Sequence, residues 1–246
     1  MSRNFELMQQ IEGDALLRSQ KPTGSKASSQ AERVCKSNLW ANDEVSSLIQ
    51  RVFRLHTQDS PRMVVFAGID HGDGCSWISA SVADSLARTA LRPVCLVEAN
   101  FRTPTLPNLF GTTNHYGLTD SLLAEDPISS YVKPVGAGKL WLLSSGGLAW
   151  DSANTFSSER VKARMAELRT EFEFVIIDAP PLSRYADAVA IGQLTDGLVV
   201  VLKAGSTRRE AAQAAVSNLR LSKVPILGSV LNKRTYPIPE SIYKRL

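Results

Sequence analysis

The sequence contains only three cysteines, Cys35, Cys75 and Cys95, among 246 residues. Their wide spacing forms neither a disulfide framework nor a zinc-binding pattern, so it favours a protein of a reducing compartment. No apolar run approaches the roughly 20 residues that a membrane-spanning helix needs. The first 20 residues also lack the continuous apolar stretch of a secretory signal. These absences predict a cytoplasmic protein, which a partner would have to recruit to the inner face of the cell membrane.

The sequence also lacks a strong excess of charge of one sign. It has 28 Lys and Arg against 24 Asp and Glu, which gives a net charge of +4. The basic residues are scattered, except for a group between Lys233 and Arg245. Scattered charges are typical of a solvated surface, so no nucleic-acid partner is expected. A hydrophobic fraction of 43% is ordinary for a soluble globular protein, and the length suffices for one large domain.

Short apolar segments alternate with amphipathic ones along most of the chain. The apolar segments predict strands over 63–67, 93–97, 140–143, 174–177, 197–202 and 226–231. The amphipathic segments predict helices over 44–56, 76–90, 157–172, 185–194 and 208–222. This alternation predicts an α/β fold with a mostly parallel sheet and helices on both faces. Ligands in such folds bind beyond the carboxyl ends of the strands.

The N-terminal part differs in composition from the rest. The segment 19–37 is rich in Ser, Lys, Gln and Ala, which indicates a flexible linker. We therefore predict a flexible or docking segment over residues 1–40 and one α/β domain over residues 41–246.

A glycine-rich turn joins the first predicted strand to its helix. It reads GIDHGDGCSW from Gly68 to Trp77. Glycines in such a turn let backbone amides surround phosphate oxygens, and the following helix N-terminus favours negative charge. A P-loop also uses a lysine to reach the β and γ phosphates and a Ser or Thr to hold magnesium. Ser76 stands at the Ser/Thr position, whereas Cys75 stands at the lysine position.

Two further motifs follow predicted strands and should reach the same edge of the sheet. Glu98, Asn100 and Arg102 follow the strand at 93–97. Asp178, followed by Ala and two prolines, ends the strand at 174–177. A carboxylate at that position can orient a magnesium-bound water.

Together these motifs resemble the deviant-Walker P-loop ATPases, and within them the bacterial tyrosine kinases of capsule and exopolysaccharide synthesis. These kinases include the CpsD/CapB type and the cytoplasmic domain of Wzc. The family carries a loop Pro-Gly-Glu-Gly-Lys-Ser/Thr, then Asp-x-Asp-x-Arg, then Asp-x-Pro-Pro. Other family-like stretches are 109–110, 117–122, 142–146, 187–188, 196–201 and 227–232. The resemblance extends from about Glu44 to the C-terminus and implies a P-loop NTPase-like α/β fold.

The resemblance also implies ligands and site residues. ATP or ADP would bind with magnesium, with Ser76 and Asp178 on the metal. Asn232 matches a position that contacts adenine in relatives. The residues implied to bind nucleotide are Gly72, Asp73, Gly74, Cys75, Ser76, Trp77 and Asn232, and those implied in catalysis are Asp178, Glu98 and Arg102. The implied partner is a membrane polysaccharide chain-length or export protein.

Several family positions are altered in this sequence. Cys75 replaces the catalytic lysine, while Glu98 and Asn100 replace the two aspartates of the second motif. The family's oligomerisation motif Glu-x-x-Arg-x-x-Arg has lost both arginines, which leaves homo-oligomerisation open. Loss of one charge-assisted phosphate contact costs about 1.5–3 kcal/mol, or about tenfold or more in affinity. These changes predict weakened nucleotide binding and impaired catalysis.

The sequence therefore leaves three hypotheses for the function. The first is a catalytically impaired relative of the kinases that regulates or scaffolds exopolysaccharide synthesis or export. The second is an active tyrosine autokinase, with Arg102 or another basic residue in place of the lysine and Tyr236 or Tyr243 as acceptors. The third is a ParA/MinD-like positioning ATPase, and the paired prolines after Asp178 favour the kinase branch over it.

Overall fold

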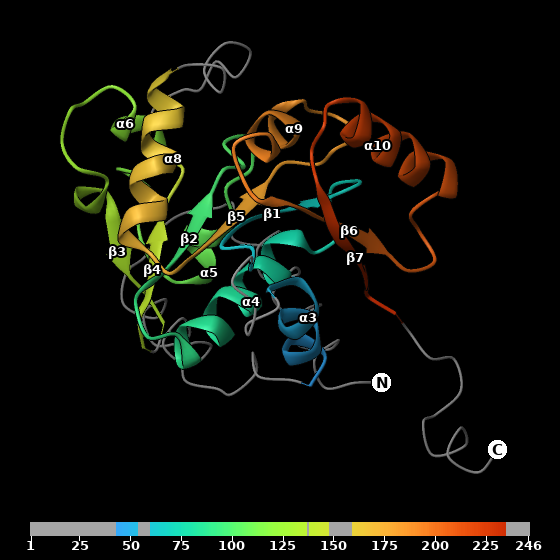
Figure 1. Ribbon diagram of the computed structural model, residues 1–246, viewed down its shortest axis with the longest axis horizontal. Coiled ribbons are helices and arrows are strands. Elements are labelled where there is room, and N and C mark those ends of the chain that lie inside the picture. The colour runs from blue at the N-terminus through green and yellow to red at the C-terminus, as the bar shows by residue number, and fades with distance from the viewer. Residues whose placement is uncertain (1–42, 54–59, 137, 148–158, 235–246) are drawn as a thin grey trace, which may run out of the picture.

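A computed structural model describes residues 43–53, 60–136, 138–147 and 159–234. These residues form a sheet that is covered by helices on both faces (Figure 1). In that view α8, α9 and α10 lie above the sheet, and α3 and α4 lie below it. The predicted N-terminal segment 1–40, with its linker, lies outside the described residues, as do Tyr236 and Tyr243.

The sheet within the described ranges has seven strands in the order β3-β4-β2-β5-β1-β6-β7. All neighbouring strands run parallel except β3 and β4, which confirms the predicted α/β architecture. The strands are β1 (Met63–Gly68), β2 (Val94–Glu98), β3 (Val132–Pro134), β4 (Leu140–Leu143), β5 (Phe174–Ala179), β6 (Gly197–Lys203) and β7 (Ile226–Asn232). Strand β3 was not predicted, because three half-exposed residues carry no apolar run.

The long helices lie close to their predicted positions. They are α3 (Asp43–Phe53), α4 (Cys75–Thr89), α8 (Glu159–Glu171) and α10 (Arg209–Leu221). The end of the predicted helix 44–56 lies outside the described residues. The prediction of a helix over 185–194 was too long, since α9 spans Asp187–Gly192. The segment before it forms a turn, in which the Tyr185 amide donates to the Pro181 carbonyl at 3.2 Å. The Leu182 amide of the same turn donates to the Gly68 carbonyl of β1 at 2.9 Å.

Three short elements between β2 and β4 were also missed. They are α5 (Leu106–Leu109), α6 (Leu118–Ser121) and the 3₁₀ helix η2 (Ile128–Ser130). Elements of one turn show no helical periodicity in a sequence. Their positions depend on distant contacts: the buried Arg164 guanidinium donates to the Ser121 carbonyl at 2.9 Å and to the Ala124 carbonyl at 2.7 Å.

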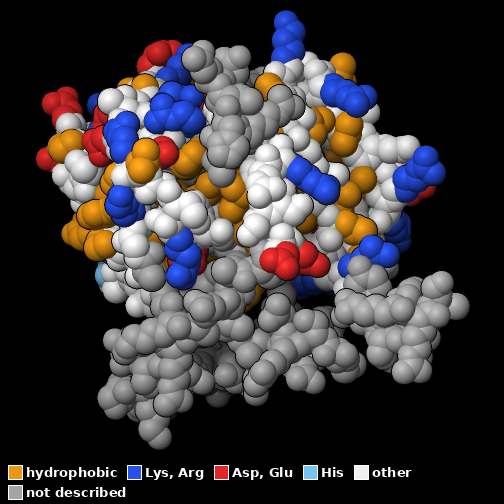
Figure 2. Space-filling model, turned by 60° about the horizontal axis from the view of Figure 1, so that its bottom comes forward, with side chains coloured by type: hydrophobic (Ala, Val, Ile, Leu, Met, Phe, Trp, Pro, Cys, Tyr) orange, Lys and Arg blue, Asp and Glu red, His pale blue; other side chains and the backbone are white. Residues whose placement is uncertain are grey.

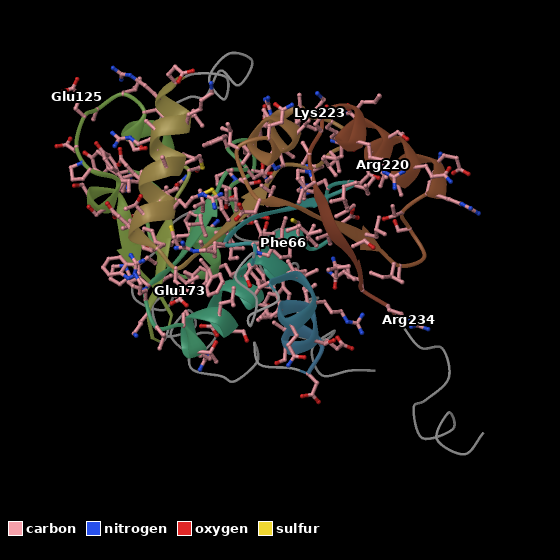
Figure 3. All side chains as sticks on the ribbon, in the orientation of Figure 1. Phe66, Glu125, Glu173, Arg220, Lys223 and Arg234 are labelled. Atoms are coloured by element: carbon pink, nitrogen blue, oxygen red, sulfur yellow. The ribbon has the colours of Figure 1, made fainter. Side chains whose placement is uncertain are left out.

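The core is divided into two clusters by the sheet. On β1, Met63, Val65 and Ala67 belong to the cluster between the sheet and the helices α8 and α9. Val64 and Phe66 belong to the cluster between the sheet and the helices α3 and α4, because successive side chains of a strand point to opposite faces. Phe66 is buried in the interior beside α4 (Figure 3). Burial on both faces explains why β1 and β5 read as continuous apolar runs.

The order of the strands decides which motifs meet. The chain leaves β1 for β2 and later returns to insert β5 between them. In the resulting register Asp178 lies opposite Phe66 of β1 on one side and opposite Glu98 of β2 on the other. The three motifs predicted at strand ends therefore do share one edge of the sheet.

The surface carries no concentrated charge on the face seen in Figure 2, where Lys and Arg side chains are dispersed among hydrophobic and neutral ones. Of the helices in the described ranges, none has the length and apolar character needed to cross a membrane.

Candidate functional site

The glycine-rich loop has the backbone conformation of a phosphate-binding turn. Gly72 and Gly74 both have φ of +84°, a left-handed conformation that costs other residues roughly 1 kcal/mol or more. Helix α4 begins directly after the loop, at Cys75. The first amides of a helix have no carbonyl acceptor within it, and they point toward the space in front of its N-terminus. The loop and helix together form a site suited to an anion.

Neighbouring segments hold the loop in place. The Asn232 side-chain amide, at the end of β7, donates to the Asp73 carbonyl at 2.8 Å. A Cβ atom at position 74 would overlap that same amide, so the close approach of Asn232 requires glycine there. On the other side, the Ser183 hydroxyl donates to Asp70 Oδ1 at 2.7 Å. The loop is thus fixed before any ligand binds.

The Asp73 side chain turns into the loop instead of facing outward. It is 3% exposed, and its Oδ2 accepts the Asp70 amide at 2.8 Å. Burial raises the pKa of Asp73, while the hydrogen bond from Asp70 and the charge of Lys203 lower it. Asp73 therefore stabilises the turn and contributes its backbone to the site.

Cys75 lies beside Asp178, the second-last residue of β5. Its Sγ lies 4.0 Å from the Ser79 hydroxyl, which in turn donates to Asp178 Oδ1 at 3.2 Å. Burial and then the negative charge of Asp178 raise the pKa of the Cys75 thiol well above its ordinary value. The thiol therefore stays protonated at neutral pH, which favours the interpretation of an inert residue over a reactive one.

Asp178 has a buried carboxylate oxygen that suits a cation. It is 1% exposed, and its Oδ2 is a buried oxygen without a hydrogen-bond partner within the described ranges. Burial raises the pKa of Asp178 to about 6, although hydrogen bonds from Ser76, Cys75 and Ser79 lower it. An unpaired buried carboxylate oxygen is costly, and a cation would satisfy it.

The oxygens at this position fit magnesium. Ser76 offers a hydroxyl and Asp178 a carboxylate, and magnesium is bound through one or two protein oxygens together with waters and substrate phosphates. Groups of three or more His, Cys, Asp or Glu side chains that could hold a metal do not occur in the described part of the chain. The residues present therefore fit a magnesium ion that arrives with a nucleotide, and such an ion would neutralise charge on the phosphates.

Glu98 is buried beside Asp178 but is already occupied by backbone amides. Its Oε2 accepts the amides of Thr105 at 2.7 Å and Leu106 at 2.8 Å, at the start of α5. Its Oε1 accepts the Asn100 amide at 3.3 Å. Burial and then the charge of Asp178 raise the pKa of Glu98 well above its ordinary value. In this structure Glu98 anchors the loop that follows β2.

Asn100 and Arg102 make contacts outside the glycine loop. The Asn100 amide donates to the Thr103 hydroxyl at 3.0 Å, within its own turn. The Arg102 guanidinium lies 4.2 Å above the centre of the Tyr185 ring and 3.8 Å from Asp187. Burial raises the pKa of Asp187 and the Arg102 charge lowers it. Arg102 thus contacts the segment after β5.

The structure brings together most of the residues singled out in the sequence. The glycine loop, Ser76, Asp178 and Asn232 meet, and Glu98 adjoins them. Trp77 packs partly buried against the core below the sheet, and His71 is exposed.

Sequence reasoning missed three residues near the site: Ser79, Lys203 and Lys233. Ser79 is four residues after Cys75 on α4, so helical spacing places both on one face. Lys203 ends β6 and Lys233 follows β7, so the rule that ligands bind at carboxyl strand ends could have identified them.

Comparison with known sequences gives named relatives, although no family model matches the chain. The tyrosine-protein kinase YwqD of Bacillus subtilis is 32% identical over 161 residues, which cover 65% of this chain and 68% of that protein. The tyrosine-protein kinase CpsD of Streptococcus agalactiae is 25% identical over 173 residues, or 70% of this chain and 75% of that protein.

Solved structures agree on the fold. The chimerical protein CapA2B2 has a TM-score of 0.74 at 21% identity and covers 82% of this chain and 87% of its own. The septum site-determining protein MinD of Pyrococcus horikoshii, complexed with Mg-ADP, has a TM-score of 0.59 at 16% identity and covers 74% and 76%. The fold is thus that of the P-loop ATPases. With the identity and coverage shared with YwqD, the chain belongs to the family of bacterial tyrosine-protein kinases.

Proposed function

We propose that this protein is a catalytically impaired member of its family that regulates or scaffolds exopolysaccharide or capsule synthesis or export. One observation carries the proposal: a protonated Cys75 thiol stands beside Asp178 where a P-loop has a lysine ammonium. Phosphoryl transfer depends almost wholly on positioning and electrostatic stabilisation of the transferred group. Without that ammonium the transition state loses a main source of positive charge.

The two acids of the site support the same proposal. The carboxylate of Glu98 accepts three backbone amides, which restricts it to a structural role. The raised pKa of Asp178, about 6, leaves a fraction of this acid protonated near neutral pH. A protonated carboxyl is a poor ligand for magnesium, so metal binding competes with a proton.

Nucleotide binding is expected to survive in weakened form. The loop amides, Ser76 and Asn232 are arranged without help from a lysine, because Asn232 and Ser183 already hold the loop. The unpaired Oδ2 of Asp178 offers a place for magnesium. ATP or ADP bound there would act as a regulator of shape or assembly.

The partner and the location that we propose are those that the family resemblance implies. A membrane polysaccharide chain-length or export protein would recruit the chain to the inner face of the membrane. On α3, Ser47 and Gln50 stand where the family motif has arginines. Homo-oligomers of this chain would therefore depend on the partner more than on α3.

Calorimetric titration with Mg-ATP and Mg-ADP, beside the Cys75→Lys variant, tests the proposal. We expect weak binding by the natural protein, binding at least tenfold tighter by the variant, and no phosphotyrosine in the natural protein. Micromolar ATP binding together with phosphotyrosine formation would refute impairment and favour the autokinase, with Tyr236 or Tyr243 as candidate acceptors. Strong, salt-dependent DNA binding would instead favour a ParA/MinD-like positioning ATPase.

A further inference from the structure

The ends of β6 and β7 place two lysines beside the glycine loop. In the register of the sheet Gly68, the last residue of β1, lies opposite Val201. Strand β6 therefore continues two residues beyond β1 and ends at Lys203. Lys203 is paired with Asn232 of β7, and Lys233 follows directly. Both lysines thus lie past the carboxyl edge of β1, where the loop begins.

Lys233 lies against the loop at its tightest point. A Cβ atom at position 74 would lie 3.5 Å from Lys233 Cε, the carbon that carries the ammonium. The residue before it, Asn232, is anchored to the Asp73 carbonyl. This anchor holds the backbone of Lys233 at a fixed distance from the N-terminus of α4.

The charge of Lys203 also reaches the loop, because it lowers the pKa of Asp73. The carboxylate of Asp73 accepts the Asp70 amide within the turn. Lys203 therefore offsets part of the negative charge of the loop.

We propose that Lys233 supplies the positive charge for nucleotide phosphates that position 75 no longer provides. This inference rests on the proposed function, since it concerns the same nucleotide site. The ammonium would approach the diphosphate from the Asn232 side of the loop. It would thus come from the end of β7, whereas the lysine of an ordinary P-loop lies at the start of the helix. The contact would be a charge-assisted hydrogen bond between an ammonium and phosphate oxygens, as a P-loop lysine makes.

The backbone of Lys233 supports a functional role. Its φ is +54°, a left-handed conformation in which glycine would be more stable by roughly 1 kcal/mol. Functional sites often contain residues in unfavourable backbone conformations, and Lys233 has one beside the glycine-rich loop.

A matched pair of variants tests the proposal. Lys223 also has a left-handed φ, +57°, but lies at the other end of β7, where α10 ends (Figure 3). Lys233→Gly and Lys223→Gly each remove one positive charge and relieve the same backbone conformation. Only Lys233→Gly removes an ammonium beside the loop. Comparing the two variants therefore separates the effect of charge at the site from the effects of net charge and of backbone strain.

The measurement is the dissociation constant for Mg-ADP and for pyrophosphate, with adenosine as the ligand that lacks phosphate. We expect Lys233→Gly to weaken Mg-ADP and pyrophosphate binding about tenfold or more, and Lys223→Gly less than about twofold. Adenosine binding should be equal in all three proteins. Lys233→Arg should keep most of the affinity, and melting temperatures should show that both glycine variants fold.

Three results would overturn the inference. If the natural protein binds Mg-ADP and Lys233→Gly binds it equally well, the inference fails while the proposed nucleotide site stands. If adenosine binding falls as much as ADP binding, Lys233 acts on the position of Asn232 and not on phosphate. If neither the natural protein nor Cys75→Lys binds Mg-ADP or pyrophosphate, both the inference and the proposed nucleotide site fail.

Discussion

The buried acid Asp178 makes the stability of this protein depend on pH in a direction opposite to that of most carboxylates. Burial raises the pKa of Asp178 from 3.8 to about 6, so the folded protein holds this proton more tightly than the unfolded chain. Its contribution to stability is fully present below pH 3.8 and is lost as the pH rises through 6. We predict that Asp178→Asn removes this dependence.

The size of the effect follows from the shift. Each pKa unit corresponds to about 1.4 kcal/mol, so a shift of roughly two units gives about 3 kcal/mol over the whole range. About 2 kcal/mol of this falls between pH 4.5 and pH 8. Asparagine keeps an oxygen that can accept the Ser79 hydroxyl, and it carries no charge that must be buried. Loss of the Asp178 charge also removes one of the causes that raise the pKa of Glu98, which acts in the same direction.

The assay is urea unfolding of both proteins, without nucleotide or magnesium, at several pH values from 4.5 to 8. The free energy of unfolding of Asp178→Asn minus that of the natural protein should increase by about 2 kcal/mol toward pH 8. Parallel pH profiles for the two proteins would refute the reasoning, because they would mean that the Asp178 carboxylate ionises as readily folded as unfolded.

Asp196 provides a control with the opposite sign. Although burial alone would raise the pKa of Asp196, hydrogen bonds from Arg169, Met63 and Arg62 lower it. This contribution to stability is present above the unfolded pKa and is lost as the pH falls. Asp196→Asn should therefore be less stable than the natural protein by a nearly constant amount from pH 8 to pH 4.5, and this deficit should narrow only below about pH 3.8.

Two further predictions concern the frame of the site. Glu98→Ala leaves the Thr105 and Leu106 amides without their acceptor, so it should lower the free energy of unfolding by roughly 2–3 kcal/mol in urea titrations. The control Glu98→Gln keeps an oxygen and should lower that free energy by less than about 1 kcal/mol. Equal losses in the two variants would contradict the anchoring role of Glu98. Gly117→Ala places a Cβ against the Ser144 carbonyl, so it should lower the free energy of unfolding by roughly 1–3 kcal/mol and lower the melting temperature. The control Gly228→Ala has open space around it and should change stability little. An unaltered melting temperature for Gly117→Ala would contradict the close approach of Gly117 to Ser144.

Much of the fold could be predicted from the sequence because it rests on local patterns. The continuous apolar runs of β1 and β5 follow from burial on both faces, and the long helices show their periodicity directly. The short elements between β2 and β4 could not be predicted, because their stability comes from distant partners such as Arg164. The turn before α9 is likewise held by a distant partner, because the Leu182 amide donates to the Gly68 carbonyl of β1.

The sequence by itself determined that a glycine loop opens a helix, that Cys75 occupies the lysine position, and that an acid follows the strand predicted at 174–177. Only the tertiary structure decided what these residues can do. The insertion of β5 between β1 and β2 buries Asp178 beside Glu98, and that burial raises the pKa of both acids. The amides at the start of α5 occupy Glu98, and the end of β7 carries Lys233 to the glycine loop. Contacts of this kind join residues that lie far apart in the chain, and no local pattern encodes them.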